Sequence, residues 1–128
     1  MSTTNSLPTG THFISLSEAA AMTHRYRKNK ETILAGNYKN SNLLPVCETF
    51  NRAAIDTLLS QPGCEGIRVY YGMSESLEVH AVIVGVNQNN EDLLAVTSLR
   101  TESEDDSIIL EKGQRCPDEC PPLSPLNE

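Results

Sequence analysis

The stretch IRVYYGMSESLEVHAVIVGV, residues 67–86, consists of two apolar runs around a short polar turn. In the first run Ile67, Val69 and Tyr71 share one face of a predicted strand, with Tyr70 on the other, because successive strand side chains alternate. The second run is apolar on both faces, which is typical of a central strand. The stretch therefore predicts a β-hairpin whose second strand lies inside a sheet.

Two helical patterns precede the hairpin. In SLSEAAAMTHRYRKNKETIL, Ser15 and Glu18 have the spacing of a capping box and predict a helix over residues 16–35, with a break near Asn29. In PVCETFNRAAIDTLLSQ the proline can occupy the first helical turn, so the amphipathic pattern predicts a second helix over residues 45–60. The turn-forming sequence QPGCEG ends it.

The chain after the hairpin predicts further strands and a distinct tail. LLAVTSL (residues 93–99) is a third candidate strand, and IIL (residues 108–110) is a short fourth one, with an acidic loop between them. Helices followed by strands predict an α+β fold, with the two N-terminal helices packed on one face of a three- or four-stranded antiparallel meander sheet. We expect a flexible arm over residues 1–14, one domain over 15–113 and an ordered Pro/Cys-rich tail over 114–128.

The charge distribution argues against nucleic acid as a partner. The net charge of the 128-residue chain is −7. Residues 1–60 hold six Lys/Arg and four Asp/Glu, 6 − 4 = +2, and residues 61–128 hold four and thirteen, 4 − 13 = −9. An acidic surface repels phosphate groups, and the basic HRYRKNK segment is interpreted as a solvated helix face.

No membrane segment and no export signal are expected. The chain has no apolar run of about 18 residues, the length that a spanning helix needs. Its N-terminus lacks a basic start and a long apolar core, so it does not resemble a signal peptide. We therefore expect a cytoplasmic protein, in which thiols are normally reduced.

The four cysteines leave three interpretations open. Cys64, Cys116 and Cys120 could hold a zinc ion with a histidine as fourth ligand, because C-x3-C spacing is allowed in such sites. Cys116 and Cys120 could instead form a disulfide if the tail makes a helical turn. The third interpretation is packed free thiols, which fits best for Cys47 on the apolar side of the second predicted helix.

One further group could carry chemistry. His80 lies on the predicted central strand and could meet Tyr70 or Arg68 across the hairpin. As an enzyme site, His80 would act as general base and Tyr70 as proton donor. The chain carries no nucleophile elbow, phosphate loop or dinucleotide motif, so a packed histidine is the favoured interpretation and enzymatic activity is not expected.

The segments PGCEGIRVYYGM and CPDECPPLSPLN resemble a group of short, uncharacterised bacterial proteins. This resemblance spans residues 15–127 and implies a bacterial, intracellular setting, with no catalytic residue to transfer. We expect a small interaction or structural protein that self-associates or docks on another protein through a sheet edge or its C-terminal tail. The alternative is a small zinc-binding or thiol-dependent protein that uses Cys64, Cys116 and Cys120.

Overall fold

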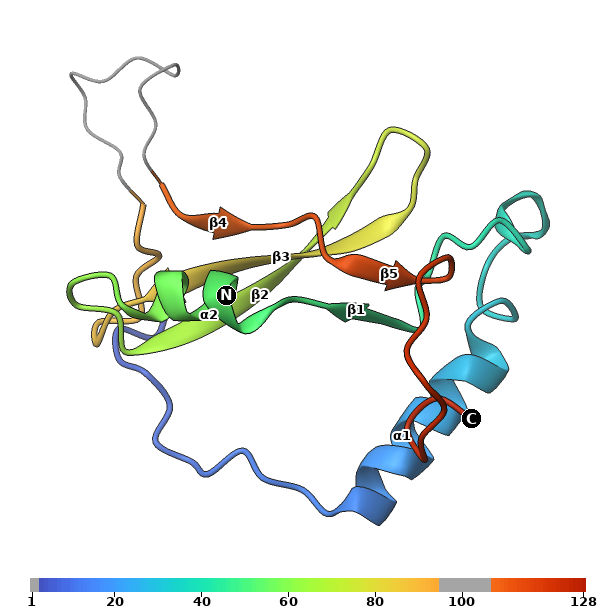
Figure 1. Cartoon of the computed structure of the whole chain (residues 1–128), viewed down its shortest axis with the longest axis horizontal. Coiled ribbons are helices and arrows are strands. Elements are labelled where there is room, and N and C mark those ends of the chain that lie inside the picture. The colour runs from blue at the N-terminus through green and yellow to red at the C-terminus, as the bar shows by residue number, and fades with distance from the viewer. Residues whose placement is uncertain (1–2, 95–106) are drawn as a thin grey trace. The chain divides into compact units, whose positions relative to one another are not determined.

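The computed structural model describes residues 3–94 and 107–128 (Figure 1). Its elements, in chain order, are α1 (Leu16–Asn29), the 3-10 turn η1 (Gly36–Tyr38), β1 (Cys47–Thr49), α2 (Arg52–Leu59), β2 (Gly66–Met73), β3 (Val79–Val86), β4 (Ile109–Leu110) and β5 (Gln114–Cys116). The predicted α+β class with antiparallel strand pairing is confirmed.

The predicted hairpin forms a three-stranded sheet with a later strand. The strand order is β2-β3-β4, so the run that is apolar on both faces is central, as predicted. β3 and β4 are antiparallel, with Ile83 opposite Leu110. Of the candidate strand at residues 93–99, the structure describes only residues 93–94. The residue before them, Asp92, forms a single β-bridge with Val86. The remainder of the candidate strand lies outside the described residues.

The second sheet corrects the prediction for residues 45–60. β1 and β5 pair in antiparallel fashion, so residues 47–49 form a strand and not the first turns of a helix. α2 begins only at Arg52, because the side chain of Asn51 accepts a hydrogen bond of 2.8 Å from the Ala54 amide. An asparagine in that position is a strong helix start. The predicted proline start was therefore wrong, since a better N-cap lies six residues later.

α1 begins as predicted and ends early. The Ser15 side chain accepts a hydrogen bond of 3.1 Å from the Glu18 amide, which confirms the predicted helix start. The helix ends at Asn29, whose side chain donates 2.9 Å to the carbonyl of Arg25. Such a side-chain bond competes with the backbone ladder. The chain then continues in turns, so the predicted break near Asn29 is confirmed, and the predicted helical continuation to residue 35 is absent.

The chain separates into two compact units, each formed from several segments. The first unit combines described residues of Met1–Thr9, Phe50–Tyr71 and Ala81–Gly113, and the second combines Gly10–Thr49, Gly72–His80 and Gln114–Glu128. The sequence predicted as one domain contributes residues to both. Among the described residues, the first unit buries Leu58, Ile83, Val84 and Val86, and the second buries Leu43 and Cys116.

Within the first unit, α2 packs against β4 and its following loop packs against β3. Leu58 on α2 has no exposed surface. A side chain at Gly85 would place its Cβ 2.9 Å from the Sγ atom of Cys64. This glycine therefore leaves the space that Cys64 fills, which explains a small residue in the middle of an otherwise branched strand.

Candidate functional site

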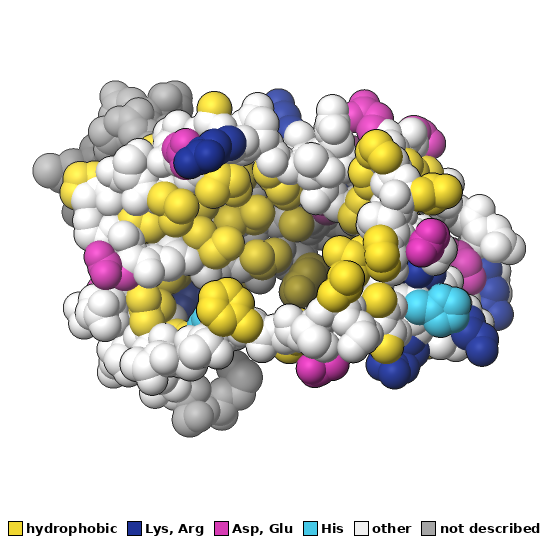
Figure 2. Space-filling view, turned by 60° about the horizontal axis from the view of Figure 1, so that its bottom comes forward, with side chains coloured by type: hydrophobic (Ala, Val, Ile, Leu, Met, Phe, Trp, Pro, Cys, Tyr) yellow, Lys and Arg dark blue, Asp and Glu magenta, His cyan; other side chains and the backbone are white. Residues whose placement is uncertain are grey.

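The clearest surface feature of the first unit is one face of β2. We call Ile67, Val69 and Tyr71 the β2 apolar face; these side chains are 47%, 42% and 81% exposed. They share one side of the strand because they alternate along it. Hydrophobic side chains also gather visibly at the surface in Figure 2. A row of exposed apolar side chains on one strand is a mark of an interaction surface.

The other side of β2 is polar and its groups are paired. The Arg68 guanidinium donates to the Asp92 carboxylate and to the Asn90 side chain. The Tyr70 hydroxyl donates 2.5 Å to the second Asp92 oxygen. This hydrogen bond to Asp92 holds the pKa of Tyr70 above its ordinary value. The Asp92 hydrogen bond also raises the pKa of Arg68, so the guanidinium charge is retained and neutralised locally.

His80, Tyr70 and Arg68 were considered above as a possible ligand-binding or catalytic group. Arg68 and Tyr70 both lie in the first unit and share Asp92, whereas His80 belongs to the second unit. Asp92 is the last residue of the polar stretch NQNNED (residues 87–92), and no motif in that stretch marks it as a partner of Arg68 or Tyr70. Asp92 pairs with Val86 on β3, and its side chain reaches Arg68 and Tyr70 on β2. The sequence has no local signal for these contacts.

β2 is also an edge strand of its sheet within the described part of the chain. Edge strands are commonly protected from pairing by proline, lysine or unpaired charge. β2 is eight residues long, contains neither proline nor lysine, and has Arg68 as its one charged residue. That charge is already paired with Asp92. This edge therefore lacks the usual protection.

The cysteines divide between the two units. Cys116 and Cys120 form a disulfide in the second unit, with their Cα atoms 4.5 Å apart. Cys64 lies in the first unit, where its thiol donates 3.4 Å to the Gly66 carbonyl. Among residues 3–94 and 107–128, no three His, Cys, Asp or Glu side chains form a group suited to a metal ion.

Cys47, which was interpreted above as a packed free thiol, is paired across two strands with a cysteine of the disulfide. Cys47 is free and half-buried, and it is the direct cross-strand partner of Cys116 in the β1–β5 pair. The sequence analysis placed it on a helix, so this juxtaposition was not foreseen. The β1–β5 pair joins segments almost seventy residues apart in the chain, which only the tertiary structure reveals.

Arg115 connects β5 to the rest of the second unit. Its guanidinium donates 3.0 Å to the Val79 carbonyl, 3.2 Å to that of Leu43 and 3.3 Å to that of Asn42. One guanidinium nitrogen also lies 3.9 Å from the Glu78 carboxylate. Because one planar group binds three carbonyls, Arg115 fixes β5 to the backbone at residues 42–43 and 79.

The end of the tail is held by α1. The Arg27 guanidinium donates 2.5 Å to the Leu126 carbonyl and 2.6 Å to the Glu128 carbonyl. Part of the basic segment HRYRKNK therefore binds the chain's own C-terminal backbone. Residues 114–128 therefore contact the rest of the second unit at two places, through the pairing of β5 with β1 and through Arg27.

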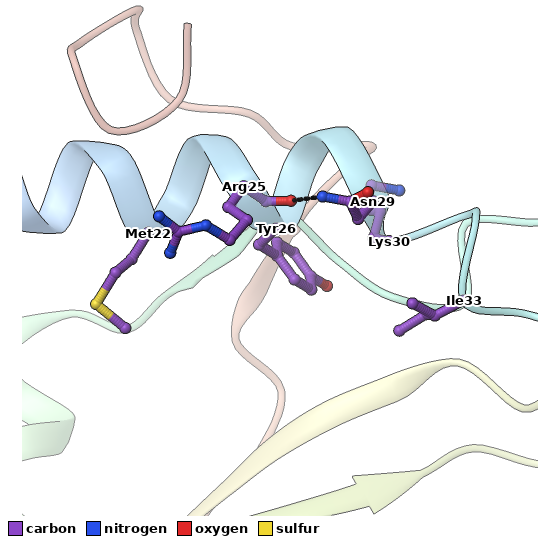
Figure 3. Close-up of a pocket in the computed structure, with 6 residues that line it drawn as sticks. All are labelled: Met22, Arg25, Tyr26, Asn29, Lys30 and Ile33. Atoms are coloured by element: carbon purple, nitrogen blue, oxygen red, sulfur yellow. Dashed lines mark hydrogen bonds between the residues drawn. The ribbon is translucent and has the colours of Figure 1, made fainter.

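A shallow hollow of about 390 Å³ follows α1 (Figure 3). It is lined by Met22, Arg25, Tyr26, Asn29, Lys30 and Ile33. The Tyr26 hydroxyl donates 2.6 Å to the Pro45 carbonyl, and partial burial raises the pKa of Tyr26. Lys30 lies 2.9 Å from Glu31 and lowers the pKa of that carboxyl. The side chains of Tyr26, Asn29 and Lys30 thus bind neighbouring protein atoms.

Comparison with known proteins adds no assignment. No protein-family model matches the chain, and neither the curated proteins nor the solved structures provide a match. Among the described residues, no helix has the length and apolar character needed to cross a bilayer. The functional argument therefore rests on the chain's own surfaces and side chains.

Proposed function

We propose that this protein is a self-associating interaction protein whose second copy pairs along the β2 edge. The observation that carries the proposal is the combination of an unprotected edge with the β2 apolar face. An edge strand presents unpaired backbone donors and acceptors, which a second strand can satisfy. Exposed apolar side chains on the same strand add the non-directional attraction that backbone pairing alone lacks.

A second copy fits this edge because antiparallel pairing of identical strands is self-complementary. The two-fold axis of such a pair is perpendicular to the sheet, so the apolar faces of both copies lie on the same side. With Val69 opposite its counterpart, Ile67 of one copy faces Tyr71 of the other. Aromatic and β-branched side chains form favourable cross-strand pairs. The six side chains would then form one continuous apolar strip.

Charge at the strand does not oppose this pairing. Arg68 is the one charged residue of β2 and is neutralised by Asp92 within its own copy. Like charges directly opposite each other would destabilise a strand pair. The paired guanidinium on the polar face avoids that cost.

The expected dimer is weak. One strand edge and three apolar side chains per copy give an interface below about 1,200 Å², the range of transient complexes. A dissociation constant in the micromolar range, corresponding to about −8 kcal/mol, is consistent with such a contact. The protein would therefore change between monomer and dimer as its concentration changes.

The test is the substitution Tyr71→Lys, with mass measured by sedimentation velocity over a concentration series. The 14.1 kDa chain should approach 2 × 14.1 = 28.2 kDa at high concentration, and the variant should remain at 14.1 kDa. Tyr71 is 81% exposed, so the lysine has room without disturbing the core. It places a cation in the apolar strip and opposes pairing.

Phe13→Lys provides the matched control. Phe13 is also aromatic, is 89% exposed and lies away from β2 in the sequence. The substitution Phe13→Lys changes net charge and surface hydrophobicity in the same way as Tyr71→Lys. We expect the Phe13→Lys variant to dimerise like the wild type. A wild-type mass of 14.1 kDa at every concentration, or equal loss of dimer in both variants, would contradict pairing along β2.

A further inference from the structure

Three cysteines meet at the β1–β5 pair. Cys116 forms a disulfide with Cys120 on one side and lies directly across from the free Cys47 on the other. Cys116 is buried, Cys47 is half-buried and Cys120 is exposed. Cys116 is thus bonded to one cysteine and paired across the strands with another, and those two cysteines belong to different segments of the chain.

Strand geometry brings Cys47 within bonding range of Cys116. Directly opposed residues of an antiparallel pair have Cα atoms about 4.5–5.5 Å apart. Disulfides require a Cα separation of about 4.4–6.8 Å. Cys47 and Cys116 therefore satisfy the backbone condition for a bond in place, without a shift of either strand.

We propose that Cys47 and the Cys116–Cys120 disulfide form an intramolecular thiol–disulfide exchange site. The Cys47 thiol loses its proton to solvent, and its thiolate attacks the sulfur of Cys116. The Cys47–Cys116 bond forms as the Cys116–Cys120 bond breaks, and Cys120 leaves as a thiolate that takes up a proton. One disulfide replaces another, so the step needs neither oxidant nor reductant.

The exchange changes what the tail presents. In the observed state the disulfide closes a small loop, and both of its sulfur atoms are engaged. In the exchanged state the disulfide links β1 to β5, and the exposed Cys120 becomes a free thiol. An accessible thiolate can attack an external disulfide, forming a mixed disulfide and releasing the external thiolate. The external ligand class is therefore a disulfide-bearing small molecule or peptide.

The first experiment uses the variant Cys120→Ser, which removes the exposed sulfur and leaves Cys47 beside Cys116. The reduced variant is treated with oxidised glutathione, quenched with acid, alkylated and digested with trypsin. Cleavage after Lys39, Arg52, Arg68 and Arg115 separates the peptides: residues 40–52 carry Cys47, residues 53–68 carry Cys64, and residues 116–128 carry Cys116. A Cys47–Cys116 bond joins the first and third peptides into one species of distinct mass.

We expect this linked species to form and glutathione to be released. In the double variant Cys47→Ser/Cys120→Ser, the glutathione adduct on Cys116 should persist at a level roughly tenfold higher or more, because the intramolecular thiol is lost. The double variant Cys64→Ser/Cys120→Ser is the matched control and should behave like Cys120→Ser, since Cys64 lies in the other unit.

The second experiment examines exchange in the wild-type chain. After equilibration in a mixed reduced and oxidised glutathione buffer, acid quenching and alkylation, both the Cys116–Cys120 and the Cys47–Cys116 links should be found, the latter with alkylated Cys120. The variant Cys47→Ser should show the first link alone. Persistent glutathione on Cys116 of Cys120→Ser would overturn the proposal. A Cys47–Cys116 link in that variant with none in the wild type would show proximity without exchange and would overturn it as well.

Discussion

Single side chains with several partners hold much of this small structure together. Arg115 satisfies the carbonyls of Asn42, Leu43 and Val79 in the second unit, and Asp92 accepts from Arg68 and Tyr70 in the first. Hydrogen bonds to charged groups are stronger than neutral ones, and removing one partner leaves the others unsatisfied. In a chain with few buried apolar residues, such groups should make a large contribution to stability.

Arg115→Lys should lower the free energy of unfolding by about 1–3 kcal/mol, because an ammonium cannot reproduce the planar fork that reaches three carbonyls. Urea denaturation of the two proteins measures the difference. Arg52→Lys is the matched control: the Arg52 side chain is 91% exposed and pairs with the exposed Asp56, so the change should stay within about 0.5 kcal/mol. Equal effects of the two substitutions would refute the role assigned to Arg115.

Asp92→Asn should lower the pKa of Tyr70 toward its ordinary value of 10.0, because the charged carboxylate that accepts a hydrogen bond from the phenol hydroxyl is removed. Since the folded-state pKa is raised, this contact stabilises the fold below pH 10 and the contribution is lost as pH rises through the raised value. Absorbance titration of tyrosinate measures the change in the pKa of Tyr70. The contribution of this contact to the stability of the wild type should fall as pH rises through the raised pKa.

Asp56→Asn is the control for that titration. It removes the same charge from an exposed pair with Arg52, in the same unit as Tyr70 but without contact to it. Its tyrosinate curve should overlay that of the wild type. If Asp92→Asn also leaves the curve unchanged, the hydrogen bond between Tyr70 and Asp92 is absent in solution.

The elements are short, and their ends are set by local hydrogen bonds. α2 has eight residues and starts at Asn51, β1 and β5 have three residues each, and β4 has two. Short helices are marginal without capping and tertiary packing. The start of α2 therefore determines where the chain changes from strand to helix.

Asn51→Ala should lower the free energy of unfolding by about 1 kcal/mol, because the Ala54 amide loses its side-chain acceptor. Asn51→Asp retains an acceptor of the same length and should stay close to the wild type. Thermal unfolding monitored by far-ultraviolet circular dichroism compares the three proteins. If the alanine and aspartate variants unfold at the same temperature, the cap does not control this helix.

For the whole molecule, charge and apolar surface act in opposite directions. Each copy carries a net charge of −7, which repels a second copy, while the β2 apolar face favours contact. Repulsion between exposed charges is screened by salt, and the Debye length shortens from about 30 Å at 0.01 M to about 8 Å at 0.15 M. The proposed dimer should therefore depend on ionic strength.

Raising ionic strength across that range should strengthen self-association severalfold, because screening reduces repulsion and leaves apolar contacts intact. Sedimentation velocity at two salt concentrations measures the change in dissociation constant. Tyr71→Lys should remain monomeric at both, which separates screening from nonspecific salting out. Association that weakens with salt would indicate an interface built from ion pairs and would argue against β2.

The pattern of side chains along the chain was enough to predict the hairpin and the start of α1. Alternation in residues 67–86 predicted the hairpin and the central position of its second strand, and the pair Ser15 and Glu18 predicted the start of α1. These signals are local: strand alternation and helix capping depend on neighbours within a few residues. The β2 apolar face followed from the same alternation, whereas its exposure did not.

Contacts between distant segments were decided only by the tertiary structure. Cys47 was assigned to a helix because its neighbours fit that period, but β5 supplied a strand partner from the far end of the chain. The partnership of Asp92 with Arg68 and Tyr70, and the three carbonyls bound by Arg115, also join segments without a shared local pattern. Periodicity indicates which face of an element is apolar. Long-range pairing depends instead on which distant segments approach each other in space, and no short window of sequence encodes this pairing.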